Sequence, residues 1–140
     1  SLNIVECANH CFGTISIGVN SAGEPELQNS IIIKKNEKLP ISNTESFETA
    51  HEGQDGINCR VTQSVAEETN PDYVKILQEI PFELPPNRPA GLEIQVTYSY
   101  DENEMMTCKF KDIESGKEVV TKISMSGQND EDDIEKFLVD

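Results

Sequence analysis

The segment from Phe47 to Val61 reads Phe-Glu-Thr-Ala-His-Glu-Gly-Gln-Asp-Gly-Ile-Asn-Cys-Arg-Val. Its second half alternates, with Ile57, Cys59 and Val61 on one face of a strand and polar residues on the other. Two glycines flank the Gln-Asp pair in the middle, and glycine tolerates the positive φ angles of tight bends. The segment therefore predicts a β-hairpin whose apolar face belongs to the core.

Strand patterns continue on both sides of this segment. Strands are expected over residues 15–19, 27–35, 39–50, 74–84, 92–100, 105–113 and 118–125. Tight turns join the last three, which predicts an antiparallel meander. Asn129 and the acidic residues 130–133 then favour a helix start. The expected fold is mainly β: a two-sheet antiparallel β-sandwich of about eight strands, followed by the start of a C-terminal helix.

Composition restricts the possible partners. The 140 residues suffice for one domain with a core, and no stretch approaches the roughly 18 apolar residues of a membrane span. The formal net charge is −15, so phosphate backbones and anionic membrane surfaces are disfavoured. We therefore expect no nucleic acid and no membrane as partners, whereas cationic peptides would be attracted to the protein. The first residues lack the pattern of a signal peptide.

The residues that commonly carry catalysis or bind metals are sparse. Cys7, His10 and Cys11 lie close together, but four ligands at a recognised spacing are missing, so no metal site is expected. Neither histidine has a convincing nucleophile and acid as partners, and no glycine-rich phosphate loop follows a strand. We expect no cofactor and no enzyme activity in this chain. Cys59 and Cys108 occupy apolar strand positions, which favours buried free thiols and a cytoplasmic location.

Several motifs occur in an order that is similar to one known family. Residues 15–19 read Ile-Ser-Ile-Gly-Val, where the family has Leu-Ser-Leu-Gly-Ile. Residues 47–50 read Phe-Glu-Thr-Ala, followed by Gln54, where the family has Phe-Ser-Thr-Ala and a glutamine. Residues 94–98 read Ile-Gln-Val-Thr-Tyr, which is similar to Ile-Glu-Val-Thr-Phe. The chain thus resembles the substrate-binding β-domain of the seventy-kilodalton heat-shock chaperones of the DnaK type, as a divergent member.

This resemblance implies a groove for extended hydrophobic peptides. By position, the central pocket is expected to contain Val19, Phe47, Ile57, Cys59 and Ile94. The positions near the peptide backbone are Ser21, Glu48, Gln54 and Asn58. Two side chains of the family arch over the peptide, and both are alanine here, Ala22 and Ala50. Alanine at both positions implies a thin arch, and Cys59 in place of a branched aliphatic residue implies a slightly wider pocket.

The resemblance also implies an organisation of the chain. Residues 1–14 would be a linker-like segment, residues 15–126 a peptide-binding β-sandwich, and residues 127–140 the start of a truncated helical lid. The expected function is that of a chaperone fragment that binds unfolded proteins. An ATPase domain outside this chain would control it, and a J-domain co-chaperone is a further expected partner. The alternative is a protein–protein interaction module with a degenerate groove. Without a full lid, the groove could also capture a neighbour's tail and cause self-association.

Overall fold

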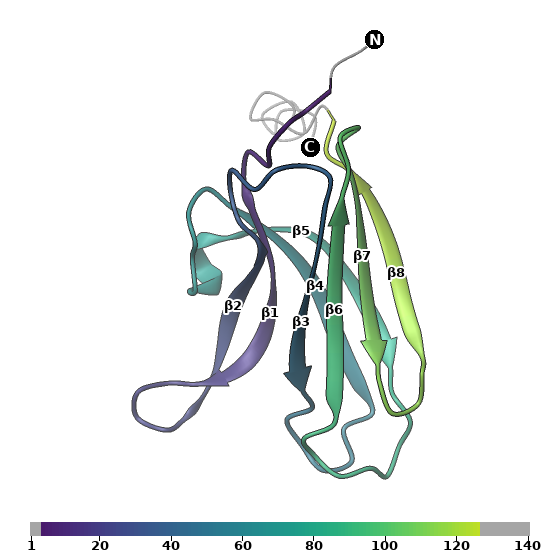
Figure 1. Ribbon diagram of the computed structural model, residues 1–140. Coiled ribbons are helices and arrows are strands. Elements are labelled where there is room, and N and C mark those ends of the chain that lie inside the picture. Colours follow the sequence, from purple (N-terminus) through teal and green to yellow (C-terminus); the bar gives the residue numbers. More distant parts are fainter. Residues whose placement is uncertain (1–3, 127–140) are drawn as a thin grey trace, which may run out of the picture.

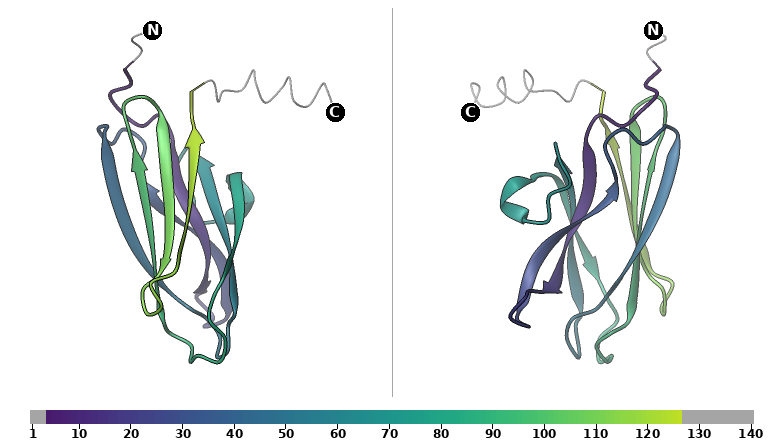
Figure 2. Two further views of the ribbon diagram at one scale, coloured as in Figure 1. Left: turned by 90° about the vertical axis from the view of Figure 1, so that its right-hand side faces the viewer. Right: turned by 60° about the vertical axis from the view of Figure 1, so that its left-hand side comes forward.

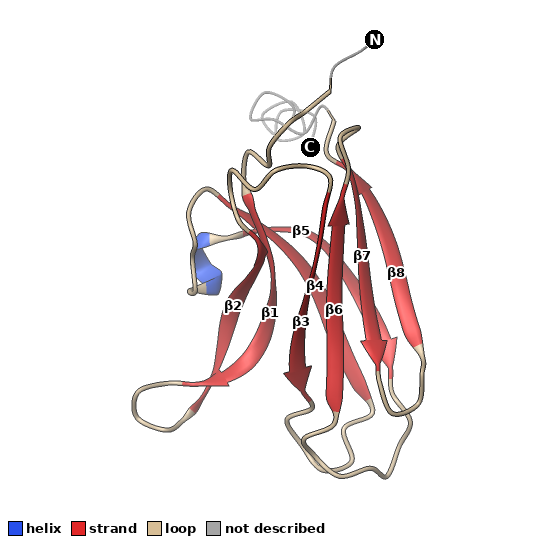
Figure 3. Cartoon of the chain, viewed as in Figure 1, coloured by secondary structure: helices blue, strands red, loops and turns tan. Residues whose placement is uncertain are grey.

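Eight strands and one short 3-10 helix lie within residues 4–126, the part of the chain that the computed structural model describes (Figures 1 and 3). The elements are β1 (Cys11–Val19), β2 (Pro25–Ile33), β3 (Ile41–Glu48), β4 (Gly56–Ser64), η1 (Pro71–Tyr73), β5 (Lys75–Glu83), β6 (Glu93–Tyr100), β7 (Met105–Asp112) and β8 (Glu118–Ser124). The helix expected over residues 127–140 lies outside the described residues. None of the described helices is long and apolar enough to cross a membrane.

The strands form two antiparallel sheets that pack face to face. One sheet has the order β2-β1-β4-β5 and the other β3-β6-β7-β8, and the two layers are seen from two further sides in Figure 2. This confirms the predicted sandwich, and the run β6-β7-β8 confirms the predicted meander. Both ends of the described chain lie at one end of the sandwich, and the β1–β2 turn lies toward the other (Figure 1).

Alternation along the strands builds the core. In β6 and β7 every second side chain is buried, as expected for a strand with one face on the core. Phe12 of one sheet meets Tyr100 of the other edge-on, with ring centroids 5.4 Å apart. The Tyr98 hydroxyl crosses between the sheets and donates a hydrogen bond of 2.7 Å to the carbonyl of Gly13. The core therefore includes a polar link between β6 and β1.

The hairpin predicted for residues 47–61 is wrong. β3 pairs with β6 along its whole length, whereas β4 pairs with β1 and β5, so the two strands belong to opposite sheets. Residues 49–55 form a loop that crosses from one sheet to the other. The alternation placed the apolar faces of both strands on the core, but facing a common core does not require pairing edge to edge. The segment is the crossover that joins the two layers.

The first strand begins at Cys11, four residues earlier than the alternation suggests. Ala8 and Phe12 are buried, and Ala8 exchanges backbone hydrogen bonds with residues 36 and 37. The sandwich therefore extends into residues 1–14, the range that the sequence assigns to a linker-like segment. β5 covers Lys75–Glu83 and confirms the strand expected over residues 74–84, where helical spacing competed with strand alternation.

Candidate functional site

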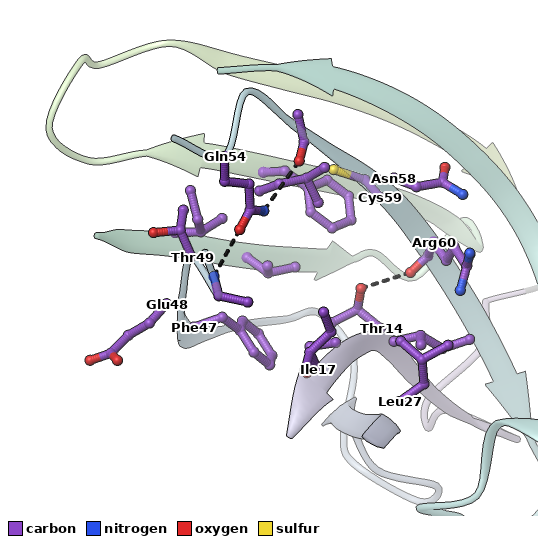
Figure 4. A pocket seen from close by; sticks show the side chains of 18 of the residues that line it. Thr14, Ile17, Leu27, Phe47, Glu48, Thr49, Gln54, Asn58, Cys59 and Arg60 are labelled. Atoms are coloured by element: carbon purple, nitrogen blue, oxygen red, sulfur yellow. Dashed lines mark hydrogen bonds between the residues drawn. The ribbon is translucent and has the colours of Figure 1, made fainter. Parts of the chain in front are cut away.

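A largely apolar cavity of about 330 Å³ lies between the two sheets, toward the end of the sandwich that carries the crossover loop (Figure 4). It is lined by Thr14, Ile15, Ser16, Ile17, Leu27, Phe47, Glu48, Thr49, Ala50, His51, Gln54, Gly56, Ile57, Asn58, Cys59, Arg60, Ile94, Val96 and Phe110. These residues come from both sheets and from the crossover loop, residues 49–55, which we call the cavity loop.

The cavity exists because β1 separates from β4. Only residues 11–14 of β1 pair with β4, and the last pair is Thr14 with Val61. Beyond Thr14, β1 pairs with β2 alone, and the β1–β2 hairpin turns away from the rest of the sandwich (Figures 1 and 2). On the opposite side, the Thr121 hydroxyl bonds the Gln78 amide and links β8 to β5. The sandwich is thus linked along one side and opens along the other.

Eight of the eleven residues that the resemblance assigned to the site line this cavity. Four belong to the expected pocket and four to the expected arch and backbone contacts: Phe47, Ile57, Cys59, Ile94, Ala50, Glu48, Gln54 and Asn58. They lie on β3, the cavity loop, β4 and β6, so the crossover and the pairing of β3 with β6 bring them together. Their contact with a peptide stays a prediction.

The other three assigned residues do not line the cavity. Val19 is the last residue of β1 and is 67% exposed. Ser21 and Ala22 lie in the β1–β2 turn, where the Asn20 side chain accepts hydrogen bonds from the backbone N–H groups of Ala22 and Glu24. The turn lies away from the cavity because the hairpin diverges. In this geometry the two arch alanines do not meet across the cavity.

Gln54 lines the cavity, and its side chain also bonds the backbone on both sides of the cavity entrance. Its side-chain oxygen accepts hydrogen bonds from the N–H groups of Ala50 and His51, and its side-chain nitrogen donates to the carbonyl of Gly56. Figure 4 shows one bond of the Gln54 oxygen and the bond of its nitrogen, and it shows the Glu48 side chain extending away from the apolar side chains. The glutamine therefore shapes the backbone at the cavity entrance.

The structure adds apolar residues that the sequence did not assign to the site. Ile17 and Leu27 are cross-strand partners in the β1–β2 hairpin, and each is 49% exposed. Ile15 joins them from β1, and Val96 and Phe110 lie deeper. The alternation of residues 15–19 placed Ile15 and Ile17 on the same face as Val19 and could have identified them. Leu27 reaches the cavity because the register of β1 with β2 places it opposite Ile17, and no local sequence pattern shows that register.

The interior of the cavity is electrically neutral. Burial raises the pKa of the Cys59 thiol to about 12, so the thiol is protonated at neutral pH and behaves as a small apolar group. Arg60 lies at the margin of the cavity, where its Nε is 3.5 Å from Oε1 of Glu79. Within residues 4–126 no group of three or more His, Cys, Asp or Glu side chains is placed to hold a metal ion. The site suits an apolar side chain rather than a charged one.

Comparisons with known proteins match most of the chain. A family model described as Hsp70 protein matches residues 13–140. The mitochondrial heat shock 70 kDa protein of Dictyostelium discoideum is 33% identical over 124 residues, which cover 89% of this chain and 18% of that protein. The chaperone protein DnaK of Anaplasma marginale (strain St. Maries) is 32% identical over 110 residues, 78% of this chain and 17% of that protein. The chain thus spans less than a fifth of the length of these relatives.

Proposed function

The chain belongs to the Hsp70 family, and from this premise we propose that it is a substrate-binding β-domain, which binds extended hydrophobic segments of unfolded proteins in the cavity. The observation that carries the proposal is the meeting of eight assigned residues at one largely apolar cavity between diverging strands. A chance agreement would leave these residues far apart instead of gathering them around one cavity.

The strand edges beside the cavity support an extended ligand. Residues 15–19 of β1 have only β2 as a sheet partner, and residues 56–60 of β4 have only β5. An extended peptide can bond to such an edge through its backbone whatever its sequence, while one side chain enters the pocket. Burying a Leu-sized side chain contributes roughly 1.5–3 kcal/mol, which suits weak and reversible binding.

Substitution of a single lining residue tests the proposal. The Ile57→Phe variant would fill part of the cavity, and Ile76→Phe is the matched control, because Ile76 is 45% exposed on β5 and does not line it. A fluorescent peptide with a central leucine and flanking arginines should lose about tenfold or more in affinity for Ile57→Phe and keep its affinity for Ile76→Phe. Equal affinity for both variants would refute the assignment of the groove.

A second function has one observation in its favour. The arch positions are alanine and the turn that carries Ala22 lies away from the cavity, so no large side chain closes over a bound peptide. The cavity could then serve a protein–protein interaction module that binds a specific folded partner. That function predicts no affinity for isolated extended peptides, so the titration of the wild-type chain distinguishes the two.

The remaining proposals concern the wider protein. We infer a separate ATPase domain that controls peptide binding, a J-domain co-chaperone as a partner, and a cytoplasmic location. The chain itself would be non-catalytic and would bind no cofactor. Adding a purified ATPase domain of the family and ATP should then accelerate peptide release only if the two parts are coupled. A full-length protein whose peptide release is unaffected by ATP would refute that coupling.

A further inference from the structure

A buried ion pair lies beside the cavity without lining it. Arg88, in the loop between β5 and β6, donates from Nη1 to Oδ2 of Asp112 at 2.8 Å, and the side chains are 12% and 0% exposed. Asp112 follows Phe110 on the core-facing side of β7 and is paired in register with Ile94. Phe110 and Ile94 both line the cavity, so the ion pair lies at the end of the core that is nearest to the cavity.

The loop that carries Arg88, residues 84–92, supports the cavity loop, and we call it the support loop. Five hydrogen bonds join the two: Gly53 N to Arg88 O (2.7 Å), Gly91 N to Thr49 O (2.9 Å), Thr49 N to Leu92 O (2.9 Å), Leu84 N to Asp55 O (2.9 Å) and Leu92 N to Thr49 Oγ1 (3.0 Å). Arg88 therefore holds β7 with its side chain and the cavity loop with its carbonyl. Through this one residue, β7 and the cavity loop are joined directly.

The ion pair is poorly suited to a purely stabilising role. Within the described residues, Asp112 Oδ1 and Arg88 Nε and Nη2 are buried and have no hydrogen-bond partner. A buried pair with unsatisfied atoms gains little over apolar side chains of similar size, because its desolvation is incompletely offset. The pair instead fixes the geometry of the two segments that it joins, since a guanidinium bonded to a carboxylate holds one orientation.

We propose that Arg88 and Asp112 are positioning residues for the peptide site: they hold the support loop against β7 and thereby hold the cavity loop in the conformation that retains a peptide. This inference rests on the proposed function. The ion pair would thereby determine how long a peptide stays bound, because loops that open more often release a ligand faster. Neither residue lines the cavity, so the effect passes through the five loop hydrogen bonds.

The double variant Arg88→Met with Asp112→Leu replaces the pair by apolar side chains and leaves no charge buried alone. Amide hydrogen exchange measured by NMR reports the loops without any peptide. We expect the N–H groups of Gly53 and Gly91 to exchange about tenfold or more faster than in the wild type, while core amides of β7 keep their rates. Unchanged exchange at both glycines would overturn the proposal.

Peptide release from the same variant is the second measurement. Stopped-flow dissociation of the labelled peptide should be about tenfold faster. The matched control is Asn29→Leu with Thr62→Val, which removes another buried polar pair, joined by a 2.6 Å hydrogen bond and outside the cavity lining. The control should leave the release rate unchanged. Equal acceleration in both variants would show general loosening and overturn the proposal.

These measurements separate the two levels of inference. A wild-type chain that binds no peptide refutes the proposed function, whereas exchange at Gly53 still tests whether the ion pair holds the loop. A wild-type chain that binds peptide, with a double variant that releases it at the wild-type rate, refutes the positioning role alone. Arg88→Lys serves as the conservative variant: a partial return toward the wild-type rate is expected because one donor can still reach Asp112, and a rate equal to that of the double variant would contradict the role of the pair.

Discussion

Replacing Gly13 by alanine tests how closely the β1–β2 hairpin is packed at its base. A Cβ atom at this position would lie 2.2 Å from the carbonyl oxygen of Ser30 and 3.0 Å from its carbonyl carbon, both backbone atoms of β2. Ordinary contact begins at 3.4 Å, so β1 and β2 would have to separate by about 1.2 Å at this point. The carbonyl of Gly13 also accepts the Tyr98 hydroxyl, and that bond would be disturbed.

The expected loss follows from these two effects. Overpacking against a backbone costs typically 1–3 kcal/mol, and weakening a buried hydrogen bond adds about 1 kcal/mol, so the free energy of unfolding should fall by roughly 2–4 kcal/mol. With a urea m-value of about 1–3 kcal/mol per molar, the unfolding midpoint should move down by on the order of 1–2 M. Urea titration followed by intrinsic tyrosine fluorescence or far-UV circular dichroism measures this shift.

Gly23→Ala is the control for this substitution. Gly23 has φ +80°, and a Cβ added there would have nothing within 4 Å, so alanine meets only backbone strain and should cost about 1 kcal/mol. A Gly13→Ala variant that loses less than Gly23→Ala would refute the packing argument. A large loss with a lower m-value would instead indicate that the folded state itself had become less compact.

Three further predictions concern charge, thiols and assembly. Burial alone would raise the pKa of Asp112, but hydrogen bonds from Arg88 and Ser115 hold it below its ordinary value. Ionised Asp112 therefore makes its full contribution to the free energy of unfolding above about pH 4, and this contribution is lost as the pH falls through the lower folded-state pKa. In the Asp112→Asn variant, the free energy of unfolding measured by urea titration should fall less steeply with pH below about pH 5. A pH dependence as steep as that of the wild type would contradict this prediction. Cys7 is exposed whereas Cys59 is buried with its pKa raised to about 12, so Cys7→Ser should abolish the fast phase of labelling by a water-soluble thiol reagent, and a surviving fast phase would argue against this burial. Capture of a neighbour's tail predicts oligomers that grow with concentration in light scattering, and a monomer at high concentration would count against it.

Much of the fold was accessible to sequence analysis because burial of one face imposes a period of two. In β6 the residues Ile94, Val96, Tyr98 and Tyr100 are all buried, and the intervening positions are not. Short turns then restrict how consecutive strands can pair, which is why the meander β6-β7-β8 was predicted correctly. The same reasoning found most strands upstream of the meander.

Sequence analysis could not predict which strands pair when they are distant in the sequence. The apolar face of β3 indicates where the core lies, but it does not indicate that β3 bonds to β6 rather than to β4. The seven residues of the cavity loop are also compatible with a wide hairpin, so loop length did not decide the matter. What the local pattern lacks is information about the strand edges, because backbone hydrogen bonds are the same for every residue type except proline.

The candidate site likewise contains residues that the sequence pattern could place and residues that it could not. Phe47 and Ile57 line the cavity because they lie on strands whose core-facing side the alternation shows. Val19 lies outside it because its exposure depends on the divergence of the hairpin, which begins five residues earlier at Thr14. The Gln54 amide bonds Ala50 of the cavity loop and Gly56 of β4, and only the three-dimensional path of the chain shows these bonds; its contact with a peptide backbone stays a prediction.

The divergence of the hairpin is stabilised locally, which argues that the opening is a feature of the fold and not a packing defect. At the point of separation the Thr14 hydroxyl donates a 2.8 Å hydrogen bond to the carbonyl of Arg60, so a side chain satisfies the β4 group that the next backbone pair would have bonded. Beyond it, Ile17 and Leu27 remain half exposed although continued pairing of β1 with β4 would have covered apolar surface. At the opening, the backbone hydrogen bonds are satisfied and apolar side chains remain exposed. This surface suits an apolar ligand, because the free energy falls when such side chains are covered and removed from water.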